Sequence, residues 1–97
     1  MIFHIVLLKF STPDSPDIKK VWKKLNDLSG RVPQLRQINV GANLVNSSRA
    51  YDLALVAKFD SLSDLKEYEI HPIHMEAAKY ARSLASNIIS VDFESID

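Results

Sequence analysis

The sequence predicts an α+β domain in which one antiparallel four-stranded sheet carries helices on one face. Three observations predict this fold class: short segments rich in β-branched and aromatic residues, intervening segments whose apolar residues recur three and four positions apart, and the order of the two kinds. The order is strand, helix, strand, strand, broken helix, strand, the pattern of a ferredoxin-like fold. The chain of 97 residues has room for one domain, which we expect to span residues 1–97.

The first predicted strand and helix lie before Gly30. Residues 2–10 are rich in Ile, Val, Leu and Phe and predict a strand, which Ser-Thr-Pro at residues 11–13 ends. Ser15 is a suitable N-cap and Pro16 suits the first helical position, so a helix should follow and stop near Gly30. Its apolar stripe comprises Ile18, Val21, Trp22, Leu25 and Leu28, and its solvated side carries Lys19, Lys20, Lys23 and Lys24.

Two strands are predicted in the middle of the chain. Between residues 35 and 44, apolar side chains alternate with polar residues or glycine, which is typical of a half-buried strand. The polar residues 46–49 indicate a loop. Residues 51–59 then predict the third strand.

The last third of the chain predicts a broken helix and a final strand. Ser61, with Asp64 three residues later, is an approximate capping box at the start of a helix. Pro72 restricts His71 to extended geometry and so ends that helix. Pro72 is also well placed to begin another helix, which should run to about Ser86, and residues 87–94 predict the last strand.

The first strand is apolar on both faces, which predicts an interface. One face carries Ile2, His4, Val6, Leu8 and Phe10, and the other carries Phe3, Ile5 and Leu7. Helices on one side leave the other side chains in water, although burying each one stabilises by about 1.5–3 kcal/mol. We therefore expect a homodimer in which two copies pack this face together. The alternative is that residues 43–50 and 95–97 fold over the face.

Composition argues against several other partners. Twelve Lys and Arg balance twelve Asp and Glu, and basic residues do not interleave with aromatic ones, so no nucleic-acid partner is expected. The apolar run at residues 5–8 is too short for a secretory signal, and no segment approaches the ~20 apolar residues of a membrane span. The absence of cysteine excludes disulfides and fits a reducing compartment, so we expect a cytoplasmic protein with no membrane partner.

The densest polar constellation is the segment Tyr68-Glu69-Ile70-His71-Pro72-Ile73-His74. The helix break should place His74 in a first helical turn, where free N–H groups and the helix dipole disfavour a protonated imidazole. A neutral imidazole is a usable base near pH 7, and the Tyr68 phenol can donate a hydrogen bond to an oxygen. His74 and Tyr68 are therefore the candidate catalytic residues.

These residues also have structural interpretations. His4 is either a core histidine bonded to a neighbour or a pocket residue, because it lies on an apolar strand. His71 is either a capping residue or a ligand contact, and Tyr68 is either a core aromatic or an active one. Two histidines three positions apart can share a metal, but no third ligand is obvious, so no metal is expected.

Several segments resemble the stress-responsive A/B barrel domain family. They are the opening Met-Ile-Phe-His-Ile-Val-Leu-Leu-Lys-Phe, the strand at residues 51–59 and the His-Pro-x-His element at residues 71–74. The resemblance covers essentially the whole chain and implies a dimeric α/β barrel of two sheets packed face to face. Family members of the olivetolic acid cyclase type are polyketide cyclases, and the resemblance implies that their catalytic tyrosine and histidine match Tyr68 and His74. Their first-strand pocket histidine matches His4, whereas Leu53 stands where they carry another pocket histidine.

Two functions are consistent with these residues. In the first, a pocket between sheet and helices binds a small apolar or carbonyl compound, with ligand contacts from His4, His71, Leu53 and Ile73. In the second, a cyclase-, lyase- or isomerase-type enzyme uses His74 to remove a proton next to a carbonyl, while Tyr68 hydrogen-bonds the enolate oxygen. Neither function requires a cofactor. An open cavity faced by both residues favours the enzyme, and a filled interior favours the binding module.

Overall fold

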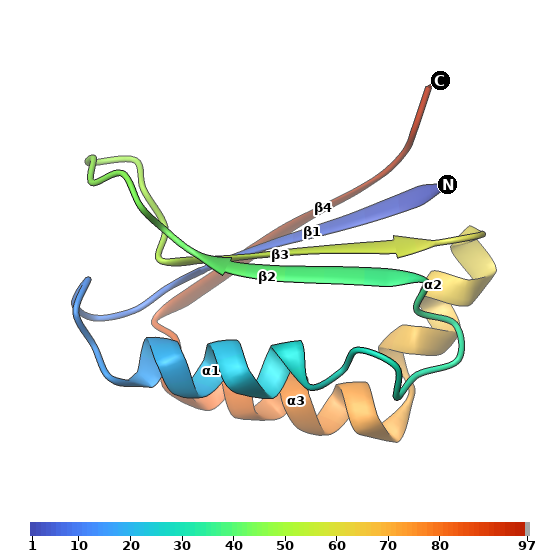
Figure 1. Cartoon of the computed structure of the whole chain (residues 1–97), viewed down its shortest axis with the longest axis horizontal. Coiled ribbons are helices and arrows are strands. Elements are labelled where there is room, and N and C mark those ends of the chain that lie inside the picture. Colours follow the sequence, from blue (N-terminus) through green and yellow to red (C-terminus); the bar gives the residue numbers. More distant parts are fainter. Residues whose placement is uncertain (97) are drawn as a thin grey trace.

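Four antiparallel strands form one sheet in the order β2-β3-β1-β4 (Figure 1). The computed structural model describes residues 1–96. β1 lies between β3 and β4, so that Ile2 pairs with Phe59 on one side and with Glu94 on the other. This sheet confirms the predicted ferredoxin-like fold. The strands are β1 (Ile2–Lys9), β2 (Gln37–Ala42), β3 (Leu53–Phe59) and β4 (Asn87–Glu94).

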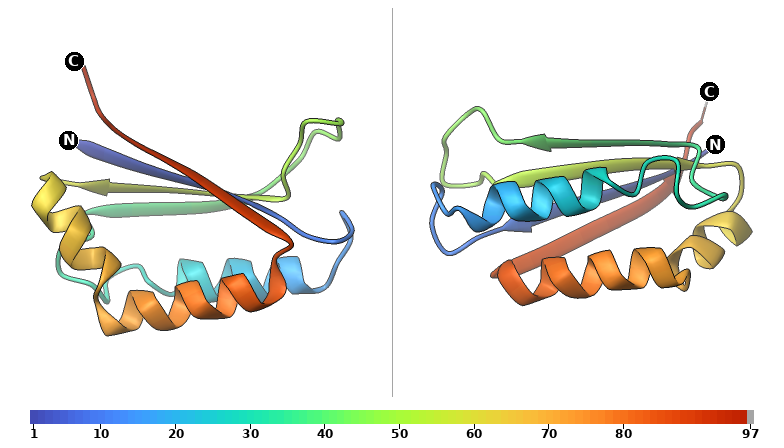
Figure 2. Two further views of the ribbon diagram at one scale, coloured as in Figure 1. Left: turned by 180° about the vertical axis from the view of Figure 1, so that it is seen from behind. Right: turned by 60° about the horizontal axis from the view of Figure 1, so that its bottom comes forward.

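Three helices lie on one side of the sheet, which leaves its other side uncovered (Figure 2). They are α1 (Asp17–Asn26), α2 (Leu62–Glu69) and α3 (Pro72–Leu84). α1 and α3 run side by side under the sheet, and α2 lies at its end. The turn after α1 uses Gly30, whose φ of +76° is a left-handed conformation that glycine adopts without strain. Within residues 1–96, none of the helices combines the length and the apolar character that a membrane crossing requires.

The boundaries of several elements differ slightly from the predicted ones. α1 begins at Asp17, whose N–H donates to the Ser15 hydroxyl at 3.2 Å. β2 and β3 both start two residues later than predicted, at Gln37 and Leu53. α3 ends at Leu84 because the next turn is replaced: the Ser86 N–H and hydroxyl both donate to the Lys9 carbonyl, at 2.7 and 3.0 Å.

The hydrophobic core fills the space between the sheet and the helices. Strand pairing places Val6 opposite Leu55 and Leu8 opposite Leu53, all on the side that faces the helices. His4 is a buried polar residue on the same side. The largest fully buried side chains are Tyr68, Phe59, Leu8, Leu28, Leu53 and Val21.

The opposite face of the sheet is apolar and exposed. Ile89, Val91 and Phe93 of β4 are 44%, 56% and 47% exposed, although all three are large apolar side chains. The strand register aligns them in three rows with residues of the other strands. The rows are Phe93-Phe3-Lys58-Gln37, Val91-Ile5-Val56-Asn39 and Ile89-Leu7-Ala54-Gly41.

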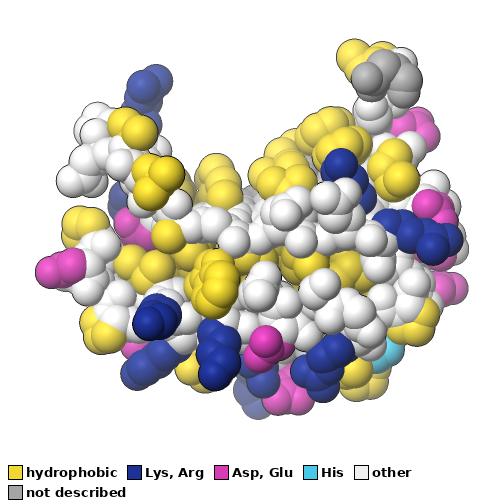
Figure 3. Space-filling view, in the orientation of Figure 1, with side chains coloured by type: hydrophobic (Ala, Val, Ile, Leu, Met, Phe, Trp, Pro, Cys, Tyr) yellow, Lys and Arg dark blue, Asp and Glu magenta, His cyan; other side chains and the backbone are white. Residues whose placement is uncertain are grey.

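Two segments rise at the ends of this face without covering it. The loop between β2 and β3 stands at one end and residues 95–96, which follow β4, stand at the other (Figure 1). Figure 3 shows hydrophobic side chains in the hollow between these raised ends. Leu44, in the loop, is 96% exposed, and Ile96 is fully exposed. The alternative in which residues 43–50 and 95–97 cover the face is therefore wrong for residues 43–50 and 95–96, and Asp97 lies outside the described residues.

Candidate active site

A cavity of about 330 Å³ lies between the inner side of the sheet and helices α2 and α3. Three predicted site residues line it together: His4 from β1, Tyr68 from α2 and His74 from α3. Glu69 and Arg82 are the charged residues of the lining. The rest is mostly apolar and includes Val6, Leu8, Leu25, Leu55, Ala78, Ala81 and Ile88. The fold thus brings acid–base side chains to an apolar pocket.

Tyr68 is held in the last turn of α2, whose start matches the sequence prediction. The Ser61 hydroxyl accepts a hydrogen bond from the Asp64 N–H at 3.1 Å, as a capping residue should. The Tyr68 ring is 1% exposed and packs on Phe59 with ring centroids 4.8 Å apart. Within residues 1–96 its hydroxyl has no hydrogen-bond partner, so it is available to a ligand. Burial raises the pKa of the Tyr68 phenol, and the charge of Glu69 adds to this effect, so the phenol remains a proton-bearing donor.

His74 lies beside Tyr68, with ring centroids 4.2 Å apart. Its Nδ1 is 3.1 Å from the Glu69 carbonyl oxygen. Because a carbonyl only accepts, Nδ1 carries the hydrogen and the neutral ring keeps its lone pair on Nε2. Burial is the main cause that lowers the pKa of His74. The Glu69 carbonyl and the Glu69 charge raise this pKa, whereas electrostatic interactions with His4 and Arg82 lower it. The side chain is therefore a neutral base near pH 7, with burial as the main cause.

The other three predicted ligand contacts lie away from this cavity. His71 is the N-cap of α3, and its Nδ1 accepts a hydrogen bond from the Ile73 N–H at 3.2 Å. Ile73 is half-buried and packs against the core. Leu53 is buried on β3 and lines a different hollow. The structural interpretation of His71 thus has a concrete basis in its capping bond.

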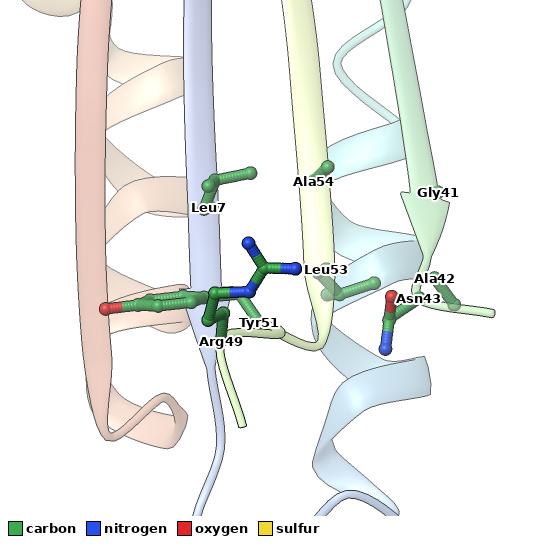
Figure 4. A pocket seen from close by; sticks show the side chains of 8 residues that line it. All are labelled: Leu7, Gly41, Ala42, Asn43, Arg49, Tyr51, Leu53 and Ala54. Carbon is green, nitrogen blue, oxygen red and sulfur yellow. The ribbon is translucent and has the colours of Figure 1, made fainter. Parts of the chain in front are cut away.

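The hollow lined by Leu53 lies at the base of the β2–β3 loop (Figure 4). Leu7 and Ala54 of the open face also line it, together with Arg49 and Tyr51. The Tyr51 hydroxyl accepts a hydrogen bond from the Asn87 amide at 2.7 Å, which fixes the side chain. No histidine lines this hollow, so it lacks the acid–base pair of the first cavity.

His4 is paired with Asp92, a residue not predicted from the sequence. The register of β1 and β4 puts the two opposite each other, and His4 Nδ1 donates a hydrogen bond to the Asp92 carboxylate. The His4 ring meets the Tyr68 ring edge-on, with centroids 6.2 Å apart. The bond to Asp92 uses Nδ1 of His4 and does not involve Nε2. The sequence offers one sign of this pairing: Asp92 is a single acidic residue within the largely apolar segment Ile88–Phe93.

Together these groups suit proton transfer to and from a bound molecule. His74 supplies a neutral imidazole, Tyr68 supplies a buried donor, and His4 supplies a second imidazole oriented by a carboxylate. Among the residues that the structure describes, no group of three or more His, Cys, Asp or Glu is arranged to hold a metal ion.

The lowered pKa of His74 makes stability depend on pH in a testable way. As pH falls below 6.5, the ring takes up a proton in the unfolded chain but not in the fold. The unfolded state then binds more protons, so the free energy of unfolding decreases as the pH falls. Above pH 6.5 the ring is neutral in both states, so this loss of stability is absent there. In His74→Gln this decrease should be smaller, as measured by urea unfolding at pH about 7.5 and about 5.5 at one protein concentration. Equal decreases in the two proteins would contradict the assignment.

Solved structures share this fold closely. Dimeric ferredoxin-like proteins of unknown function from Bacteroides fragilis and Thermobifida fusca are each 28% identical to this chain, with TM-scores of 0.81 and 0.83. The matches cover 97% of this chain, and 95% and 90% of the two proteins. A hydroxynitrile lyase from Passiflora edulis has a TM-score of 0.80 at 18% identity, over 95% of this chain and 90% of its own, which shows a shared fold alone.

Sequence comparison gives the family. A stress-response A/B barrel domain-containing protein of Arabidopsis thaliana is 29% identical over 97 residues, which cover 96% of this chain and 36% of the plant protein. The chain therefore spans little more than a third of that relative. A family model described as the stress responsive A/B barrel domain matches residues 2–95. The chain belongs to the stress responsive A/B barrel domain family, as its strand-one and His-Pro-x-His segments predicted.

Proposed function

We propose that this chain forms a homodimer in which each protomer binds a small, largely apolar carbonyl compound and removes a proton next to its carbonyl. One observation carries the chemical part: Tyr68 and His74, with ring centroids 4.2 Å apart, line one open cavity. A volume of about 330 Å³ suits a small ring or a short acyl chain. Had side chains filled this space, binding without chemistry would have been the better interpretation.

The dimer is supported by the open face of the sheet. Six large apolar side chains of β1 and β4 face outward there, and they are Phe3, Ile5, Leu7, Ile89, Val91 and Phe93. A second copy related by a two-fold axis offers the same apolar surface in return. The Bacteroides fragilis and Thermobifida fusca proteins, which share this fold, are dimeric. The hollow at the base of the β2–β3 loop would then lie at the interface rather than at the site of chemistry.

The proposed step is a proton transfer. The lone pair on His74 Nε2 takes a proton from the carbon next to the carbonyl, and the electrons of that C–H bond move to the carbonyl oxygen to form an enolate. Tyr68 donates a hydrogen bond to this oxygen as its negative charge grows. According to the compound, the enolate then attacks a second carbonyl in an aldol-type cyclisation, takes up a proton at another position in an isomerisation, or expels a leaving group in a lyase-type cleavage. No cofactor takes part in this step.

The second candidate is a binding module that holds the same class of compound without changing it. It differs from the enzyme only in the fate of the bound molecule, because both functions begin when a compound occupies the same cavity.

We also propose that the protein is cytoplasmic. The support for this location is the cysteine-free composition, which fits a reducing compartment.

A two-stage experiment tests the proposal. Small aromatic ketones and β-keto compounds are first screened by thermal shift. A ligand that binds the folded state should raise the Tm, and the rise should grow with ligand concentration. At 100 times its Kd, such a ligand adds about 2.7 kcal/mol to the free energy of unfolding. Each ligand is then kept in D2O with the protein, and proton NMR follows exchange of the hydrogens next to its carbonyl. Protein-dependent exchange is expected. Binding without exchange would favour the binding module over the enzyme. A screen in which no compound shifts the Tm would contradict both candidates.

A further inference from the structure

A positively charged residue stands at the far end of the cavity from the candidate catalytic pair. Arg82, in the last turn of α3, lines the same cavity as His74. Ala78 lies between them on the helix, four positions from each, so the three residues share one face of α3. The pKa of His74 is itself lowered by the charge of Arg82, which is consistent with their facing a common space.

The Arg82 guanidinium has no carboxylate partner within residues 1–96. The described ion pairs join His4 to Asp92, Lys20 to Asp17, Lys24 to Glu76 and Arg36 to Asp60. Glu69 is the other charged residue of the cavity lining, and no ion pair links it to Arg82. A planar guanidinium with free donors is the side chain best suited to hold a carboxylate through two parallel hydrogen bonds.

The spacing along α3 sets the size of a molecule that reaches both ends. Arg82 lies eight positions after His74 along α3, which corresponds to about 12 Å of helix rise. The wall between them is apolar, with Ala78 and Ala81 on the helix and Leu25 opposite. The cavity therefore has a reactive end, an apolar middle and a cationic end.

We infer that Arg82 binds a carboxylate on the ligand, remote from the carbonyl at which His74 acts. The inference rests on the proposed function and narrows its ligand to keto acids whose two polar groups are separated by a short aliphatic or aromatic segment. A single guanidinium matches the single charge of a carboxylate. A phosphate dianion would be poorly matched, because Arg82 is the only Lys or Arg of this lining and the second charge of the phosphate would have no partner there.

A structural role for Arg82 makes a different prediction. A cation in the last turn of a helix interacts favourably with the helix dipole, and this effect does not involve the cavity. Lys79 provides a matched control, because it is exposed, lies on the same helix and does not line the cavity. Arg82→Gln and Lys79→Gln each remove one positive charge from α3. Arg82→Lys keeps the charge but loses the planar guanidinium that makes two parallel hydrogen bonds.

The test compares a straight-chain methyl ketone that ends in a carboxylate with its primary amide, each titrated by calorimetry at several chain lengths. The unchanged protein and Lys79→Gln should bind the acid about tenfold or more tightly than the amide. Arg82→Gln should bind both forms equally, with the amide affinity preserved, and Arg82→Lys should keep part of the preference. An acid preference that persists in Arg82→Gln, or that Lys79→Gln also loses, would overturn the inference while the proposed function stands. If neither form binds at any length, the proposed function fails and the inference fails with it.

Discussion

Replacing His74 with alanine is expected to lower kcat/KM by about 10²–10⁴-fold for any carbonyl compound that the protein turns over. The His74 side chain supplies the base, whereas the other imidazole of this cavity, that of His4, is bonded to the Asp92 carboxylate. His74 lies on the helix side of the sheet, so the variant should keep the assembly state of the unchanged protein. Steady-state kinetics and light scattering on the same preparation measure both quantities.

Two further variants show whether the loss is specific. Met75→Ala changes the neighbouring residue, which is 53% exposed and does not line the cavity, and it should leave kcat/KM unchanged. Tyr68→Phe should cost about 10²–10³-fold by removing the donor to the enolate oxygen. Combined with His74→Ala it should add little, because the two residues act on one step. Full turnover in His74→Ala would refute the assignment of the base.

Replacing Val91 with glutamate is expected to convert the proposed dimer to monomers. Val91 lies in the middle row of the open face, next to Ile5 on β1 and with Val56 beyond it on β3. A carboxylate buried there without a partner costs several kcal/mol, and a two-fold axis would bring two of them into the same apolar layer. Size-exclusion chromatography with light scattering at micromolar concentration measures the change.

Met75→Glu is the matched control for this substitution. Its side chain is exposed to a similar degree, but it lies on α3, on the opposite side of the molecule from the open face. It should leave the assembly state unchanged. A Val91→Glu protein that remains dimeric at micromolar concentration would mean that the open face is not the interface.

The elements of the fold were predictable because each depends on nearby residues. The Ser61 cap and the helix break at Pro72 are local features, and both occur where the sequence places them. The two-sided apolar pattern of residues 2–10 likewise predicted a face left uncovered. What the sequence did not specify is where each segment stops, since the turn at Ser86 depends on a hydrogen bond to Lys9, 77 residues away.

The site was predictable only in part, for the same reason. Tyr68 and His74 are six residues apart across a helix break, so their proximity follows from one local motif. The pairing of His4 with Asp92 spans 88 residues and depends on the register of β1 against β4, which the sequence pattern does not reveal. The resemblance to a known family suggested a pocket position for Leu53, but the packing of β3 buries it away from the cavity with the histidines.

The dimer through the open sheet face is tested most directly by sedimentation equilibrium of the unchanged protein at micromolar concentration. The apolar rows of β1 and β4 predict one species with twice the chain mass of 11.0 kDa. A single species at 11.0 kDa would mean that water covers this face.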